Sequence, residues 1–134
     1  MTDNTYTPAI RVHEFSGDGA LQIVHSYGGG GFRITKAPYD GSQFILPRYR
    51  QNWAAKTAKD ISFKGLLAML GSERPDLLLL GLGVVPMTNL PKLRNSLSEV
   101  NVRLEVMSTP AACRTWNVMV SEGRSVAAGL LAID

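Results

Sequence analysis

The second half of the chain has the clearest pattern of hydrophobic and polar positions. Leu77 to Leu80 form an unbroken apolar run of strand length, which is typical of a strand buried on both faces of a sheet. The stretch from Val102 to Val106 instead alternates between apolar and charged side chains, as in a strand with one buried face. A third apolar strand is predicted from Val126 to Ile133.

Helix signals surround these strands. Each predicted helix has a polar residue that can cap its start, and glycine follows two of them, as expected for a residue in the left-handed conformation. The predicted helices are Phe63 to Leu70, capped by Ser62 and ended by Gly71; Leu90 to Ser98, capped by Thr88 or Asn89; and Pro110 to Glu122, capped by Thr109 and ended by Gly123. Strands that alternate with helices at these lengths predict an α/β sheet with right-handed crossovers.

The first half of the chain has shorter apolar segments separated by turn signals, which predict antiparallel hairpins. These segments are a short strand from Ile10 to Phe15, an apolar run from Ala20 to Val24, Phe32 to Ile34, and Phe44 to Leu46 ending at Pro47. Turns are predicted at 17–19, 28–31 and 39–42, and Ile61 is predicted to end a further strand. We expect residues 1–134 to form a single domain in which residues 1–9 are a flexible leader.

Composition excludes several classes of protein. The chain is 45% hydrophobic and 19% charged with a formal net charge of +3, and its basic residues are scattered, so nucleic-acid binding is not expected. One cysteine fits a reducing compartment, and the N-terminus lacks the features of a signal peptide. The longest apolar run is too short to span a bilayer. We therefore expect a cytoplasmic protein without a membrane span, although peripheral association with a membrane stays open.

Two glycine-rich stretches are candidates for phosphate binding, and neither matches a nucleotide motif. Gly28 to Gly31 are followed by a strand-like segment rather than by the Lys-Ser/Thr of a phosphate loop, so a hairpin turn is favoured. Gly81 and Gly83 follow a buried strand, but Pro86 stands where the dinucleotide motif requires a third glycine. A loop at this end of a strand can still line a cleft, although close packing is the favoured reason for these glycines.

The helix from Pro110 to Glu122 holds the only cysteine. A thiol at a helix N-terminus can have a lowered pKa, so Cys113 is a candidate nucleophile, or the helix N-terminus a candidate anion site assisted by Arg114. The favoured alternative is that Cys113 is a small buried hydrophobic residue, because both histidines, His13 and His25, lie in the distant first half. The pattern contains no metal-ligand spacing, so we predict neither a metal nor another cofactor.

Two longer motifs resemble a known family. They are P-D-L-L-L-L-G-L-G from Pro75 and V-R-L-E-V-M-S-T-P-A-A-C-R-T-W-N-V-M-V-S-E-G-R-S-V-A-A from Val102. F-R-I before Tyr39-Asp40-Gly41-Ser42, then Pro47 and Trp53, fit as well. The chain resembles, from Ile10 to Ala132, a small domain family of uncharacterised bacterial and archaeal proteins. This family includes the mitochondrial complex I (NADH dehydrogenase) assembly factor three and the adipogenesis-associated protein.

The resemblance implies a three-layer α/β domain with a central mixed sheet and an extra β layer from the N-terminal half. It implies no reaction, because the mitochondrial member acts by protein–protein contact. The family motif covers Gly81, Gly83, Thr109, Ala112, Arg114, Asn117, Glu122, Gly123 and Arg124 in this chain. Since no mitochondrial presequence precedes the motif, we expect a bacterial protein, which in the cytoplasm can lie peripheral to the inner membrane.

Two functions follow as predictions. The favoured one is a non-catalytic protein-interaction domain, such as an assembly factor for a respiratory membrane complex, with a protein partner and with homo-oligomerisation left open. The alternative is an enzyme-like domain that binds a small molecule or anion in the cleft between the Gly81–Gly83 loop and the helix at Pro110, with Arg48 or Arg114 pointing inward. The candidate binding residues are Gly81, Gly83, Arg114, Asn117, Glu122 and Arg124.

Overall fold

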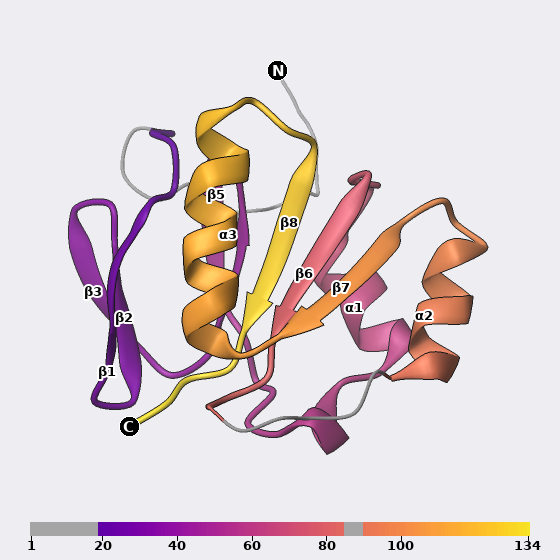
Figure 1. Cartoon of the computed structure of the whole chain (residues 1–134), viewed down its shortest axis with the longest axis horizontal. Helices are drawn as coiled ribbons and strands as arrows, with labels where there is room; N and C mark the ends of the chain where they lie inside the picture. Colours follow the sequence, from indigo (N-terminus) through magenta and orange to yellow (C-terminus); the bar gives the residue numbers. More distant parts are fainter. Residues whose placement is uncertain (1–18, 85–89) are drawn as a thin grey trace.

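The computed structural model describes residues 19–84 and 90–134. Its strands are β1 (Val24–Gly28), β2 (Gly31–Ile34), β3 (Ala37–Asp40), β4 (Gln43–Leu46), β5 (Tyr49–Asn52), β6 (Leu77–Gly81), β7 (Arg103–Met107) and β8 (Val126–Leu130). Its helices are α1 (Phe63–Leu70), α2 (Pro91–Ser98) and α3 (Thr109–Ser121), with a 3₁₀ turn, η2, at Ala58–Asp60. Figure 1 shows these elements around a central sheet.

The central sheet has five strands in the order β5-β4-β8-β6-β7. The strands β7, β6 and β8 run parallel, whereas β4 pairs antiparallel with β8 and β5 antiparallel with β4. All residues of β6 and of β8 are buried, because helices or strands cover both faces of the sheet. The unbroken leucine run in β6 and the small residues of β8 therefore form the centre of the molecule.

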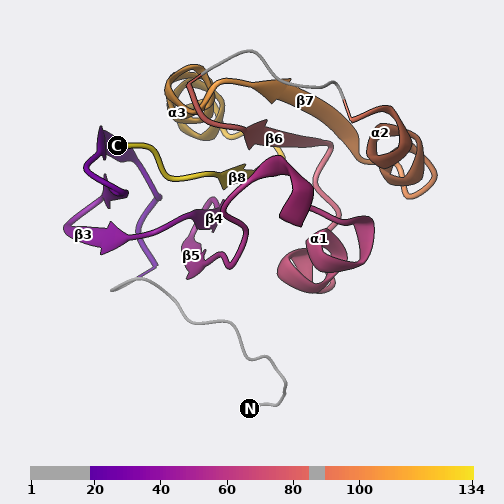
Figure 2. The same cartoon turned by 90° about the horizontal axis from the view of Figure 1, so that it is seen from below.

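The two faces of this sheet bury different sets of residues. On one face, Leu78 and Leu80 pack with Leu66 and Leu70 of α1 and with residues of α2. On the other face, Leu77 and Leu79 pack with Trp116 of α3 and with side chains from β1 and β2. Figure 2 shows α1 and α3 on opposite sides of the sheet, and Figure 1 shows β1, β2 and β3 beside α3. The architecture therefore has three layers.

The third layer is completed by the antiparallel sheet β1-β2-β3, which is fixed to α3 and to the C-terminal tail. The indole N–H of Trp116 donates to the carbonyl of Gln22 (2.6 Å), and both residues are completely buried. The Gly30 N–H, in the turn between β1 and β2, donates to the carbonyl of Ile133 (2.8 Å). The second sheet is thus part of the same packed structure as the first.

The structure confirms the predicted α/β fold class, including the mixed central sheet, the crossover helices and the extra N-terminal β layer. The helix predicted over Phe63–Leu70 is confirmed with its cap: the Ser62 hydroxyl accepts from the Gly65 N–H, and Gly71 has φ +61°. The glycine tract forms the predicted hairpin turn, in which Gly29 and Gly30 have φ +63° and +81°.

Several local predictions are wrong. Ser108 caps α3 instead of Thr109, and the strand expected over 20–24 begins only at Val24. Ile61 follows a 3₁₀ turn instead of ending a strand. The strand predicted to Ile133 ends at Leu130, because the chain then turns toward Ser42 and Gly30. The leader at 1–9, the strand at 10–15, His13, most of the turn at 17–19, Pro86 and the caps Thr88 and Asn89 lie outside the described residues.

The part of the chain described here contains no helix long and apolar enough to cross a membrane. Within the same ranges, 19–84 and 90–134, His, Cys, Asp and Glu side chains form no group of three that could hold a metal ion.

Candidate interaction surface

The first turn of α3 lies at the carboxyl end of β6, and its backbone donors all have acceptors within the chain. The Thr109 N–H donates to the carbonyl of Gly83 (2.7 Å), and the Ala112 N–H donates to the carbonyl of Ser108 (2.9 Å). The Ala111 N–H donates to the Ser108 hydroxyl (3.3 Å), and Pro110 has no N–H. Anion binding at a helix N-terminus depends on free N–H groups, so these contacts oppose it.

On the Gly81 side, the predicted cleft is filled by the chain itself. A Cβ added at Gly81 would lie 2.9 Å from the Thr109 Cα and 3.0 Å from the Ala112 Cβ, so the glycine allows α3 to approach the strand. The Thr109 hydroxyl accepts from the Gly83 N–H (3.0 Å) and donates to the carbonyl of Leu131 (2.8 Å). In many α/β proteins a ligand occupies this position, whereas here Thr109 and the C-terminal tail occupy it.

Cys113 belongs to the apolar core between α3 and the central sheet. Its side chain is 2% exposed and packs in the same cluster as Trp116 and Leu79. Burial raises the pKa of the Cys113 thiol to about 12, although the positive charge of Arg114 acts in the opposite direction. The thiol is therefore protonated at neutral pH, and the prediction of a buried small hydrophobic residue is confirmed.

Asn117 joins α3 to the edge of the three-stranded sheet. Its side-chain carbonyl accepts from the Val24 N–H (2.9 Å), and its side-chain amide donates to the Val24 carbonyl (2.8 Å). The side chain thus forms the same pair of hydrogen bonds that a neighbouring strand forms. Its polar atoms hold the layers together in this structure.

The outward face of α3 carries a solvent-exposed apolar residue among charges. Val118 is 57% exposed and lies one helical turn from Arg114 on one side and from Glu122 on the other. The Glu122 carboxylate and the Arg124 guanidinium are 3.9 Å apart, and both side chains are more than half exposed. A shallow hollow of about 320 Å³ is lined by Arg114, Thr115, Val118, Met119, Glu122 and Arg124, which we call the α3 surface.

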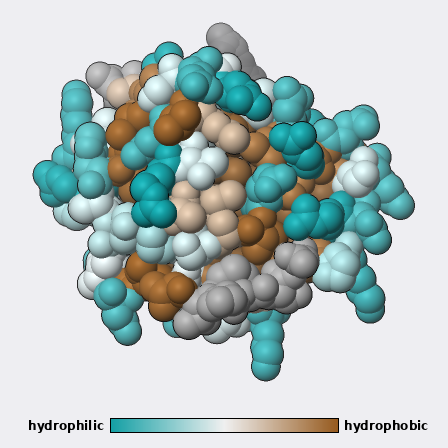
Figure 3. Space-filling view, in the orientation of Figure 1, coloured by the Kyte–Doolittle hydropathy of each residue, from teal (hydrophilic) through white to brown (hydrophobic). Residues whose placement is uncertain are grey.

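The structure thus places the six predicted binding residues at three separate positions. Arg114, Glu122 and Arg124 share the α3 surface, whereas Gly81 and Gly83 lie beside the first turn of the helix and Asn117 bonds Val24 of β1. Figure 3 shows hydrophobic and hydrophilic residues intermixed over this side of the molecule. Val118 was not among the predicted residues, although its spacing from Arg114 and Glu122 places it on the polar side of the helix.

Comparison with known proteins identifies relatives of the chain. A family model described as "Protein of unknown function (DUF498/DUF598)" matches residues 24–131. An uncharacterised protein of Rhodobacter capsulatus is 41% identical over 114 residues, which are 84% of this chain and 86% of that protein. The NADH dehydrogenase [ubiquinone] 1 alpha subcomplex assembly factor 3 of Danio rerio is 31% identical over 110 residues, 81% of this chain. This alignment spans only 63% of the Danio rerio protein, less than two thirds of its length.

Solved structures share the fold. A protein of Bartonella henselae described as an outer membrane protein has a TM-score of 0.77 and 29% identity, covering 90% of this chain and all of that one, 100%. The Rpa2829 protein of Rhodopseudomonas palustris has a TM-score of 0.73 and 31% identity, covering 94% of this chain and 92% of that one. A Mth938-like domain of Bordetella pertussis, at 23% identity and a TM-score of 0.71, covers 91% of this chain and 92% of its own and supports the fold alone.

Proposed function

This chain belongs to the DUF498/DUF598 family, and from that premise we propose that it is a non-catalytic protein-interaction domain that assists the assembly of a respiratory membrane complex. Relatives of the chain carry the name of an assembly factor for NADH dehydrogenase, which supports this choice of complex. Assembly factors act by binding other proteins, so the proposal requires a surface that a partner can cover.

The observation that carries the proposal is the exposure of Val118 within the α3 surface. More than half of the Val118 surface stays in contact with water in the monomer, whereas a partner can bury it. Arginine residues surround it, and arginine is enriched at protein interfaces because its side chain both packs and forms hydrogen bonds. We propose that Arg114, Glu122 and Arg124 contact the partner.

The other predicted residues have a supporting role in this proposal. Gly81 lets α3 approach the sheet, and the backbone of Gly83 bonds Thr109 at the start of the helix. Asn117 fixes the helix against β1, so that its outward face is held rigidly. The filled cleft and the bonded first turn of α3 count against the alternative, a ligand site beside Gly81. We place the protein in the cytoplasm, where it reaches the inner membrane through its partner rather than by a membrane span.

The proposal is tested by complementation in a bacterium that encodes the chain. Deletion is expected to lower the amount of fully assembled NADH dehydrogenase on native gels, and the wild-type chain is expected to restore it. Val118→Lys should fail to restore it, because a lysine in the middle of the α3 surface prevents an apolar contact. The lysine is compatible with α3 itself, since Glu122 lies one turn away and the helix C-terminus favours a positive charge.

Val84→Lys is the matched control, because Val84 is the same residue type, is 65% exposed and lies outside the α3 surface. Both variants should unfold at the wild-type temperature and accumulate to the same level. Full restoration by Val118→Lys, or equal failure of both variants, contradicts the role of the α3 surface. Normal amounts of the assembled complex in the deletion strain contradict the assembly function itself.

A further inference from the structure

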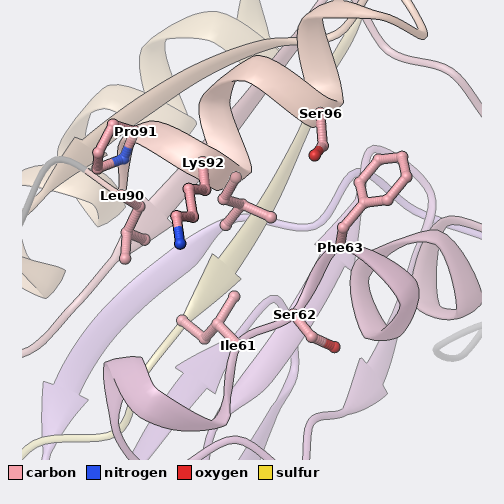
Figure 4. Close-up of a pocket in the computed structure, with 8 residues that line it drawn as sticks. Ile61, Ser62, Phe63, Leu90, Pro91, Lys92 and Ser96 are labelled. Carbon is pink, nitrogen blue, oxygen red and sulfur yellow. The ribbon is translucent and has the colours of Figure 1, made fainter.

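A second hollow lies on the face of the central sheet opposite α3. Figure 4 shows this groove between the chain before α1 and the first turns of α2. It has a volume of about 490 Å³ and is lined by Ile61, Ser62, Phe63, Leu90, Pro91, Lys92, Leu93 and Ser96. The α3 surface and this groove share no lining residue. A partner that fills one hollow therefore leaves the lining of the other uncovered.

The groove has apolar walls and one charge. Ile61 and Phe63 on one side and Leu90 on the other are only partly buried, although all three pack on the core between the sheet and the helices. Lys92 is the single charged residue among the described lining residues, and Figure 4 shows its side chain extending across the groove toward Ile61. Hydrophobic contact and attraction for a negative charge are thus combined in one hollow.

The backbone at this groove is held in an unfavourable conformation. Leu90 precedes α2 with φ +52° and ψ +58°, a left-handed conformation that leucine rarely adopts. The turn lets α2 start at Pro91 and places Leu90 in the wall of the groove. Strained positions of this kind are concentrated at binding sites, because local stability alone does not favour them.

We propose that this groove docks an apolar segment of a partner protein that carries an Asp or Glu facing Lys92. The apolar side chains of the segment replace water against Ile61, Phe63 and Leu90, and its carboxylate pairs with the Lys92 ammonium. The first turn of α2 contains no acidic residue, so the positive end of the helix dipole adds to the attraction for the carboxylate.

Charge and shape favour such a partner over two other occupants. A symmetric contact between two copies of the chain brings the two Lys92 side chains toward each other, and like charges oppose it. A lipid surface is flat on this scale and leaves a concave groove unfilled, whereas side chains of a peptide can enter it. The inference goes beyond the assembly function proposed above, because it concerns a different face of the molecule.

The test uses two fluorescent helical peptides with the full-length chain. Both are leucine-rich and about 16 residues long, with Glu at every fourth position in one and Lys in the other. By fluorescence anisotropy, the wild-type protein should bind the Glu peptide at least about tenfold more tightly than the Lys peptide. Lys92→Glu should reverse this preference, and Ser96→Phe, which fills the groove, should weaken both peptides.

Lys64→Glu is the matched control, because it makes the same change of charge on neighbouring α1 at an exposed residue that does not line the groove. It should leave the preference of the wild-type protein intact. An unchanged preference in Lys92→Glu, or an equal reversal in Lys64→Glu, overturns the proposal. The proposal is also overturned if the wild-type protein is a dimer that Ser96→Phe dissociates. It is overturned as well if Lys92→Glu weakens binding to phosphatidylglycerol vesicles more than it weakens binding to the Glu peptide. These measurements do not depend on the α3 surface, so their failure leaves the complementation result intact.

Discussion

Cys113 illustrates how a single buried position decides the chemistry of a residue. The thiol lies near the start of α3, where the aligned backbone dipoles favour the thiolate. Its surroundings are apolar, and the cost of moving a charge out of water exceeds this local effect. The pKa therefore rises from 9.0 to about 12, so at pH 8 the folded protein holds roughly a thousandfold less thiolate than an exposed cysteine.

We predict that the Cys113 thiol does not react with Ellman's reagent at pH 8 in the folded protein and reacts fully in 8 M urea, about the concentration that unfolds most domains. Two properties slow the reaction in the folded protein: the side chain is 2% exposed, and burial disfavours its thiolate form. Reduced glutathione in both buffers serves as the control for reagent activity. A native rate similar to that of glutathione contradicts the buried position.

The same pKa shift has a consequence for stability. The pKa of the Cys113 thiol is about 12 in the folded protein and 9.0 in the unfolded chain, so the unfolded chain releases the proton first as the pH rises. The contribution of the protonated thiol to stability is therefore complete below pH 9 and is lost between pH 9 and about 12. The free energy of unfolding should fall by up to about 1.4 kcal/mol per pH unit in this window from this group. Urea titrations of the wild type and of Cys113→Ala should differ in this slope, and equal slopes contradict it.

The sequence could not predict whether the hydroxyl of Ser108 or that of Thr109 caps α3. Ser108 and Thr109 are adjacent and both suit the N-cap, so local rules cannot separate them. Thr109 is completely buried, and its hydroxyl joins Gly83 to Leu131, residues that are distant in the sequence. Ser108 is left to cap the helix, since the tertiary contacts already use the threonine.

At the scale of elements, Asn117 and Trp116 connect α3 to the layer formed by β1, β2 and β3. Trp116 donates to Gln22, just before β1, and Asn117 bonds both backbone groups of Val24 at the start of β1. The remaining contact is apolar, with Val24, Phe32 and Ile34 packed against the helix side of the sheet. The β1 edge is thus satisfied by a side chain instead of by another strand.

We predict that Asn117→Leu loosens this layer without unfolding the central sheet. Leucine has a similar size but leaves the Val24 N–H and C=O without their partner, at a cost of roughly 1–3 kcal/mol per group. The Thr35 N–H donates to the carbonyl of Ile23, next to Val24. By hydrogen exchange, the amides of Val24 and Thr35 should exchange faster, while the amides of β6 keep their protection.

Thr115→Leu provides the comparison for the Asn117 variant, because Thr115 is a partly buried polar residue of the same helix that lines the α3 surface instead of bonding β1. This variant should leave the exchange of Val24 unchanged. Faster exchange throughout both sheets in Asn117→Leu would falsify a local role for the side chain.

Helices whose ends are marked by capping residues were predictable from the sequence, and short strands were not. The helix from Phe63 to Leu70 was found at its observed bounds, because Ser62 and Gly71 mark its ends. The strands β3 and β5 were missed, since each has four residues, and Pro38 and Arg50 interrupt their apolar pattern. Arg50 is held by contacts invisible to local rules, including its guanidinium 3.7 Å from the Tyr39 ring centre.

For the whole molecule, the sequence indicated which residues of α3 share a face but not which parts of the chain meet that face. Arg114, Val118 and Glu122 lie on one surface because residues four apart on a helix share a face, which the sequence can reveal. Arg124 lies beyond the helix end and joins this surface beside Glu122. The groove beside Lys92 was not predictable, since its walls come from two segments separated by a strand of the central sheet. The three-layer arrangement was predicted from the family resemblance, since local sequence patterns do not show how layers stack.

The C-terminal tail, residues 131–134, connects these layers. The Leu131 N–H donates to the carbonyl of Gly81 in β6 (2.9 Å), and the Ala132 N–H donates to the Ser42 hydroxyl before β4 (3.0 Å). The carbonyl of Ile133 accepts from Gly30 in the three-stranded sheet, and the Leu131 side chain is 3% exposed. Four residues thus contact the central sheet, the start of α3 and the third layer.

We predict that a chain ending at Leu130 unfolds at a temperature lower by at least about 10 °C, because it loses the burial of Leu131 and several hydrogen bonds, together roughly 3–5 kcal/mol. A chain ending at Ile133 is the control, since it removes only the exposed Asp134 and should keep the wild-type melting temperature. Differential scanning calorimetry checks both. Equal melting temperatures for all three chains mean that the layers hold together without the tail, and the stabilisation must then come from the apolar contact of α3 with both sheets.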